Sequence, residues 1–258
     1  LSTLIVAPYI YSMLLKGNCV ATNYKEEKIP IGMGLIFILV QFGVILISSF
    51  YINVDNSSIL SYISIVSLIG LVGMIDDLIG ESTVKGFKGH IKSLFQGKLT
   101  TGGLKAVVGF LSSIIFSLLI SSNYIDMLIN IFLIPLFINL INLFDLRPGR
   151  AGKAFLTLSI VLMITASISK YNFIIYSAIG IIIVYMRYDL KAKSMLGDIG
   201  SNSLGATLGM YCALTNDISI KIIYLIVLIL LHIIAEFYSF SKIIDKYKIL
   251  KYLDNLGR

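Results

Sequence analysis

Long apolar stretches constrain this chain more than any other feature of its sequence. A helix needs about 20 mostly apolar residues to cross a bilayer, and the chain offers nine candidates, at 1–15, 31–52, 59–75, 101–120, 125–144, 154–168, 172–188, 203–214 and 220–235. Only 14% of its residues are charged, against about 25% in soluble domains. We therefore predict an all-α, polytopic membrane helical bundle that forms one domain over residues 1–258, with about nine transmembrane helices.

The basic residues indicate the orientation of this bundle. Nine crossings place successive loops on alternate sides, and one set of loops holds seventeen of the 21 Lys and Arg residues: 16–30, 76–100, 145–153, 189–202 and 236–258. Because Lys and Arg collect on the cytoplasmic side, we expect a multi-pass protein of the cell membrane with its amino end outside. The net charge of +7 then indicates orientation and not nucleic-acid binding. The chain begins with Leu, so we also expect a missing amino-terminal piece.

The carboxyl-terminal tail carries a second helical pattern. Within residues 240–258, apolar side chains recur every three or four positions with lysines between them. This pattern predicts an amphipathic, basic cytoplasmic helix on the anionic inner leaflet. A solvated helix end is the alternative.

Acidic residues gather at predicted helix ends on the cytoplasmic side, at Asp76, Asp77, Asp145, Asp198 and Glu236. Singly, each could be a loop charge that fixes topology. Together with the basic residues of the same loops, they supply the groups that bind a hard divalent cation and its phosphates. We predict Mg²⁺.

Three stretches concentrate these groups. Residues 70–80 carry the Asp-Asp pair followed by glycine, and residues 139–145 place Asn, Asn and Asp at i, i+3 and i+6, roughly one helix face. Residues 196–209 place Asp198 in a glycine turn before a helix that Ser201 could cap. The two later glycines of this stretch predict close helix packing.

With Pro-Ile-Gly-Met-Gly at 30–34, these stretches resemble the polyprenyl-phosphate N-acetylhexosamine-1-phosphate transferases (glycosyltransferase family 4, MraY/WecA-like) over most of the chain. The resemblance implies Mg²⁺-dependent transfer of a sugar-1-phosphate from a nucleotide sugar, usually a UDP sugar, to undecaprenyl phosphate in cell-wall (peptidoglycan) or surface-glycan synthesis. A homodimer is one assembly that the sequence allows.

The resemblance also implies residue roles. It assigns catalysis to Asp76, Asp77 and Asp198, with Asp76 accepting the lipid-phosphate proton or orienting that phosphate and Asp77 holding the site geometry. The metal ligands are expected to be Asp198, Asp145 and Asn142. The candidate phosphate contacts are Lys85, Lys88, Lys92, Arg147 and Arg150.

Two departures from the family pattern keep alternatives open. Pro148 stands where the family has a second Asp, inside the basic loop Arg-Pro-Gly-Arg at 147–150, and the family's His-rich stretch is missing. A relative with altered or lost chemistry is therefore the first alternative. A transporter is less favoured, because transporters carry ionisable residues near the bilayer midplane.

The predicted topology can be tested with single cysteines in a background that lacks Cys19 and Cys212. A cysteine at Asn56 should react with an impermeant thiol reagent in intact cells, because residues 53–58 are predicted to be external. A cysteine at Lys88 should react only after the membrane is opened. Labelling of position 88 in intact cells would contradict the orientation.

Overall fold

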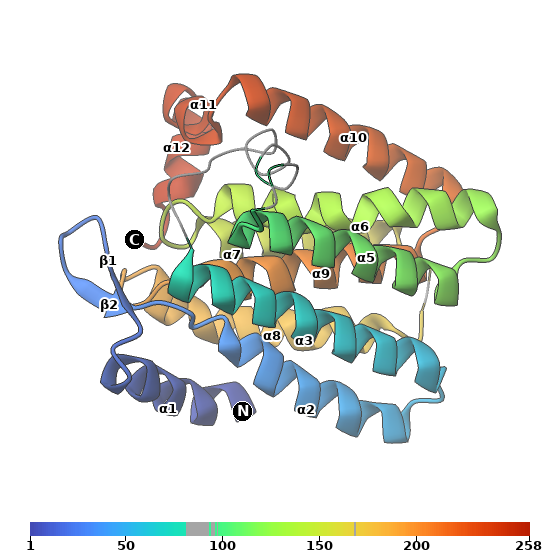
Figure 1. Cartoon of the computed structure of the whole chain (residues 1–258), viewed down its shortest axis with the longest axis horizontal. Coiled ribbons are helices and arrows are strands. Elements are labelled where there is room, and N and C mark those ends of the chain that lie inside the picture. Colours follow the sequence, from blue (N-terminus) through green and yellow to red (C-terminus); the bar gives the residue numbers. More distant parts are fainter. Residues whose placement is uncertain (81–92, 94–95, 97, 168) are drawn as a thin grey trace.

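Eleven α-helices make up most of the described chain. The computed structural model describes residues 1–80, 93, 96, 98–167 and 169–258. The helices lie along one another in a bundle (Figure 1) and are α1 (Ser2–Lys16), α2 (Leu35–Tyr51), α3 (Asn56–Ile79), α5 (Thr101–Ile120), α6 (Tyr124–Phe144), α7 (Arg150–Thr165), α8 (Asn172–Asp189), α9 (Gly197–Thr215), α10 (Ile218–Phe237), α11 (Phe240–Lys246) and α12 (Lys248–Asn255). The all-α, polytopic fold predicted from the sequence is confirmed.

Nine of these helices, α1, α2, α3 and α5 to α10, coincide with the nine predicted apolar segments. Among the described residues, α3, α5, α6 and α10 are long and apolar enough to cross a membrane, and α2 is apolar but shorter. The largest change of boundary is in α9, which begins six residues before the predicted start at 203. The number of crossings remains a prediction, while the positions of the helices are observed.

Helix α9 is the central helix of the bundle. It packs against α2, α3, α5, α6, α7 and α8, and almost every one of its side chains is buried. Small residues allow this close packing: a side chain at Gly205 would overlap the backbone of Ile138, and one at Gly209 would lie 2.8 Å from the Ile134 Cα. The predicted small-residue face is thus the contact with α6.

A short hairpin precedes α2 and was not anticipated by the all-α prediction. Strands β1 (Val20–Thr22) and β2 (Lys28–Pro30) pair antiparallel. The turn is stabilised by Asn23, whose side-chain oxygen accepts two backbone N–H groups within it. The Met195 N–H donates to the Pro30 carbonyl at 2.8 Å. The hairpin is therefore joined to the segment that leads into α9.

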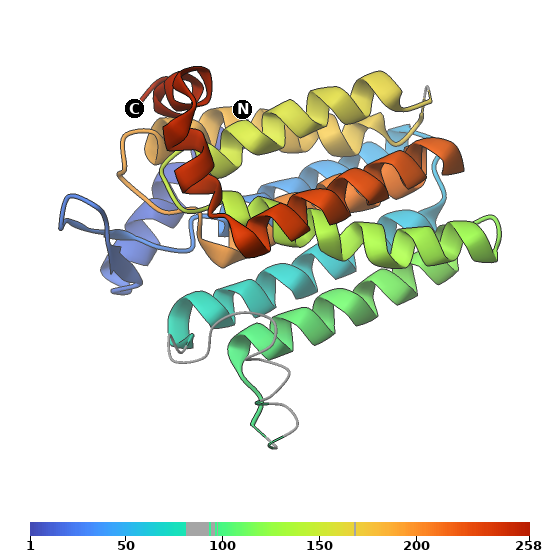
Figure 2. The ribbon, with the colours of Figure 1, turned by 90° about the horizontal axis from the view of Figure 1, so that it is seen from above.

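The tail differs from the single amphipathic helix predicted for it. It forms α11 and α12, separated by extended backbone at Tyr247. The Phe240 ring stacks on Phe144 at the end of α6, with centroids 4.9 Å apart. Figures 1 and 2 show the tail and the hairpin at the same end of the bundle. Two of the predicted basic loops, 16–30 and 236–258, therefore lie at one end of the bundle.

The packing of α9 on α6 predicts opposite outcomes for two glycine substitutions. Gly205→Ala should lower the free energy of unfolding by about 1–3 kcal/mol, because the added methyl group meets α6 backbone. Gly109→Ala in α5 has nothing within 4 Å of its new methyl group and should be neutral or stabilising by about 0.5–1 kcal/mol. Unfolding in detergent measures both, and equal stability of the two variants would contradict the packing.

Candidate active site

A largely buried lysine joins three of the predicted site residues. Lys105, in α5, donates from Nζ to Asp76 Oδ2 at 3.2 Å and forms a short ion pair with Asp198. Asn142 contacts both members of this ion pair when its side-chain amide is oriented to satisfy them. Its nitrogen then donates to Asp198 Oδ1 and its oxygen accepts from Lys105 Nζ, each at 3.0 Å. These residues come from α3, α5, α6 and α9. The structure thus brings together three stretches that lie far apart in the sequence.

Asp77 caps the start of α9 from the neighbouring helix α3. Its carboxylate accepts the backbone N–H groups of Asp198 (2.8 Å) and Ile199 (3.2 Å). A helix N-terminus leaves its first N–H groups without partners inside the helix, and a carboxylate also interacts favourably with the helix dipole there. Asp77 therefore holds the backbone of Asp198 in position.

The predicted cap, Ser201, is wrong. Ser201 lies inside α9, is completely buried, and its hydroxyl makes no hydrogen bond to any described residue. The helix begins earlier, at Gly197, which adopts a left-handed conformation (φ 74°). A side chain there would overlap the Asp77 carboxylate. Gly73 allows the approach of α3, since a Cβ on it would lie 2.5 Å from the Asp198 carbonyl oxygen.

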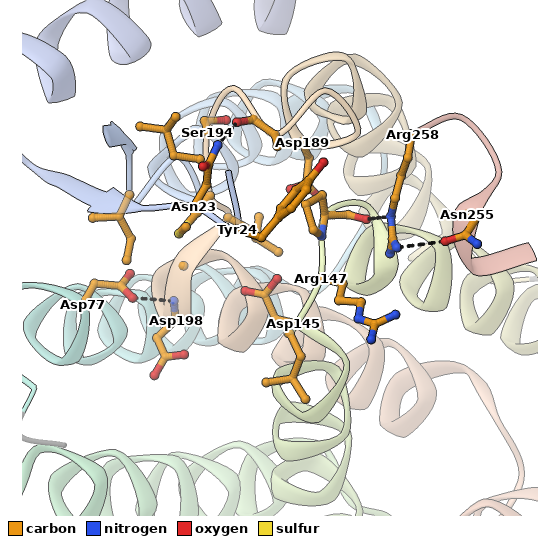
Figure 3. Close-up of a pocket in the computed structure, with 18 residues that line it drawn as sticks. Asn23, Tyr24, Asp77, Asp145, Arg147, Asp189, Ser194, Asp198, Asn255 and Arg258 are labelled. Carbon is orange, nitrogen blue, oxygen red and sulfur yellow. Dashed lines mark hydrogen bonds between the residues drawn. The ribbon is translucent and has the colours of Figure 1, made fainter. Parts of the chain in front are cut away.

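A cavity of about 680 Å³ opens beside this cluster. Its lining includes Asp77, Asp198, Asp145 and Asp189, together with Arg147 and Arg258. In the view of Figure 3, Asp77 and Asp198 lie on one side, the two arginines on the other, and Asp145 between them. The cavity therefore has an acidic side and a basic side.

Asp145 lies near three other carboxylates of this cavity, those of Asp77, Asp189 and Asp198. It follows the last residue of α6, and burial, reinforced by the charges of Asp189, Asp198 and Asp77, raises its pKa well above the ordinary value. No ion pair to Asp145 occurs among the described residues. Asp189, which the sequence analysis did not select, accepts the Gly149 N–H at 2.9 Å.

The donor groups fit a hard divalent cation without forming a complete cage. Within the described parts of the chain, no three His, Cys, Asp or Glu side chains cluster as a ready-made metal site. Mg²⁺ usually needs only one or two carboxylates, with water and substrate phosphates completing its shell. Asp145 and Asp198 both line the cavity, and the two Asp198 oxygens are also contacted by Lys105 and Asn142. Asn142 instead contacts Asp198 and Lys105.

The basic loop at 147–150 behaves differently from the prediction. Arg150 was predicted to contact phosphate, but it is buried at 3% exposure and forms a double hydrogen bond to Asp254 of α12, both at 2.8 Å. That expectation is wrong, because the tail folds over the loop. Arg147 does line the cavity, and it forms a double hydrogen bond with Asp245.

The remaining predicted residues fall elsewhere. Lys85, Lys88 and Lys92 lie outside the described residues, and Glu236 is not among the described residues that line the cavity. The sequence analysis missed Lys105 as a site residue, together with Asp189 and Arg258. A lysine just inside a predicted spanning helix was the available signal for Lys105, because such a residue needs a charged partner.

Comparisons with known proteins show the family to which the chain belongs. A family model described as glycosyl transferase family 4 matches residues 59–216. Two phospho-N-acetylmuramoyl-pentapeptide-transferases, from Prochlorococcus marinus strains MIT 9301 and MIT 9215, are each 26% identical over 76% and 77% of this chain. The chain spans 59% of the length of each of these relatives.

The Asp77 cap predicts a specific loss of stability. Asp77→Ala removes both acceptors at the start of α9 and should cost about 0.5–2 kcal/mol of unfolding free energy, as for other helix caps. Asp77→Asn keeps one acceptor oxygen and should cost less. Ser201→Ala should change stability little, because the hydroxyl has no partner among the described residues. Thermal unfolding in detergent that ranks Ser201→Ala as the more damaging change would contradict the cap.

Proposed function

Because the chain belongs to glycosyl transferase family 4, we propose that it transfers a sugar-1-phosphate from a nucleotide sugar to undecaprenyl phosphate. The donor is a uridine diphosphate (UDP) sugar, the cofactor is Mg²⁺, and the product enters cell-wall or surface-glycan synthesis. The reaction takes place at the cytoplasmic face of the cell membrane. The similarity to phospho-N-acetylmuramoyl-pentapeptide-transferases supports this class of reaction.

The observation that carries the proposal is the meeting of Asp76, Asp198 and Asn142 on Lys105, at the edge of a cavity with acidic and basic sides. A membrane-embedded lipid phosphate and a water-soluble donor need a shared site at the interface. This cavity lies at the end of the bundle where the basic loops gather, which the charge distribution favours as the cytoplasmic end.

The chemistry needs few protein groups. An oxygen of the lipid phosphate attacks the phosphorus next to the sugar, a new P–O bond forms, and the bond to uridine monophosphate breaks. Asp76 accepts the lipid-phosphate proton or orients that phosphate. Lys105 offsets the negative charges of Asp76 and Asp198 before the substrates arrive, and Asp77 keeps Asp198 in place.

Asp145 and Asp198 are the residues that would hold Mg²⁺. When bound, Mg²⁺ neutralises charge on the diphosphate and stabilises the charge that develops in the transition state. Asn142 positions the Asp198 carboxylate through the hydrogen bond to Oδ1. Arg147, on the opposite side of the cavity, retains N–H groups that its bonds to Asp245 do not use and can contact the donor phosphates.

A turnover assay tests the proposal directly. Purified full chain is incubated with undecaprenyl phosphate, Mg²⁺ and a panel of labelled nucleotide sugars, and lipid-linked product and uridine monophosphate are measured. Transfer from at least one UDP sugar is expected. Absence of product with every donor would favour a relative with lost chemistry, and solute uptake by proteoliposomes without product would favour transport.

Asp198→Asn gives the sharpest test of the site. The substitution keeps size and hydrogen bonding but removes the charge, so turnover should fall on the order of 10²–10³, as when one transition-state stabiliser is lost. The Mg²⁺ concentration that gives half-maximal activity should rise with it. Elution and melting are compared with wild type first. Wild-type turnover with an unchanged Mg²⁺ midpoint would remove Asp198 from the site.

A further inference from the structure

The tail is fastened to the loop at 147–153 by a concentrated set of charges. Arg150 Nε and Nη2 each donate to the Asp254 carboxylate at 2.8 Å, and Arg258 donates to the same carboxylate at 3.0 and 3.2 Å. An Arg147 nitrogen lies 3.9 Å from it. Asp254 itself is 6% exposed. Three guanidinium groups therefore surround one buried carboxylate.

The charges in this cluster do not cancel. Lys153 adds a fourth cation, which donates to the Leu253 and Asp254 carbonyls at the end of α12. Asp245 is the second acid, paired with Arg147. Four cations thus face these two carboxylates, and Asp189, which interacts with Arg258 and Lys153, is a third acid beside them. Asp254 nevertheless stays ionised, because the Arg150 hydrogen bonds and the charges of Arg150 and Arg258 outweigh the effect of burial and lower its pKa.

Two of these four cations line the cavity. Arg147 and Arg258 line the cavity opposite Asp77 and Asp198, as Figure 3 shows, and Asn255 lines it beside them. We name Arg147 and Arg258 the basic wall. Arg258 reaches this place because its Nε donates to the Pro148 carbonyl at 2.7 Å. The tail thereby adds a cation to the lining of the cavity.

We propose that the tail completes the donor site, with the basic wall binding the diphosphate of the nucleotide and Asp254 acting as the positioning residue that holds Arg258 there, while Asp245 holds Arg147. This inference rests on the proposed function, since it takes the nucleotide sugar as the ligand. A tail that served only as an anchor would not need to direct a cation into the cavity. Here Arg258 of the tail lines the cavity together with Arg147, and guanidinium groups bind phosphate oxygens in pairs.

The test measures binding of UDP to the purified full chain by titration calorimetry, so that it does not depend on turnover. Arg258→Gln should weaken UDP binding about tenfold, which corresponds to about 1.4 kcal/mol. Lys251→Gln is the matched control: it removes one positive charge from an exposed position of the same tail, outside the described lining of the cavity. The control should bind as wild type does.

The role of Asp254 is tested by two conservative substitutions, one that removes its charge and one that keeps it. Asp254→Asn should weaken UDP binding and raise the donor KM with kcat less affected, and Asp254→Glu should recover part of the loss by restoring the charge. Melting curves accompany each variant. Should Asp254→Asn fail to fold, because it leaves buried Arg150 without its partner, Arg258→Gln decides the question.

The outcomes separate this inference from the proposed function. Loss of UDP binding in Arg258→Gln but not in Lys251→Gln supports the basic wall, even if wild type transfers no sugar phosphate and the proposed function falls. Wild-type UDP affinity in Arg258→Gln, or no UDP binding by wild type, overturns the basic wall. If the assay still shows transfer in that case, the proposed function stands alone.

Discussion

The arrangement of the site depends on the buried start of α9. The first N–H groups of a helix need partners, and a buried helix start cannot obtain them from water. No side chain of α9 supplies them, so Asp77 of α3 does. This bond requires the backbones of α3 and α9 to approach closely, which Gly73 and Gly197 allow. Once that contact forms, Asp198 is placed beside Lys105.

Charge balance then organises the surroundings of Asp198. The acidic residues at these helix ends would repel one another without a cation, and the structure supplies one from the protein itself, the Lys105 ammonium. Asp145 lies farther into the cavity and has no ion pair among the described residues. The protein thus neutralises one part of its acidic cluster and leaves another facing the cavity, where a substrate or a metal can complete it.

The two arginines of the loop at 147–150 have different roles, which the sequence alone does not distinguish. Arg150 points into the protein and holds the tail, while Arg147 points to the cavity and is held by the tail through Asp245. Pro148 contributes its carbonyl, which accepts from Arg258. A local motif of basic residues suggests phosphate binding. In the folded chain, both arginines of this motif bond to the tail, Arg147 to Asp245 of α11 and Arg150 to Asp254 of α12.

The sequence by itself determined the helical bundle, the positions of its nine apolar helices and the stretches that carry the site, because hydrophobic length and periodicity act locally along the chain. It also indicated the family. Only the tertiary structure decided which partner each charged group takes: Lys105 for Asp76 and Asp198, Asp77 for the start of α9, and Asp254 for Arg150. Those pairings join residues between 29 and 121 positions apart. They follow from how the helices pack, and no local pattern encodes a partner at that separation.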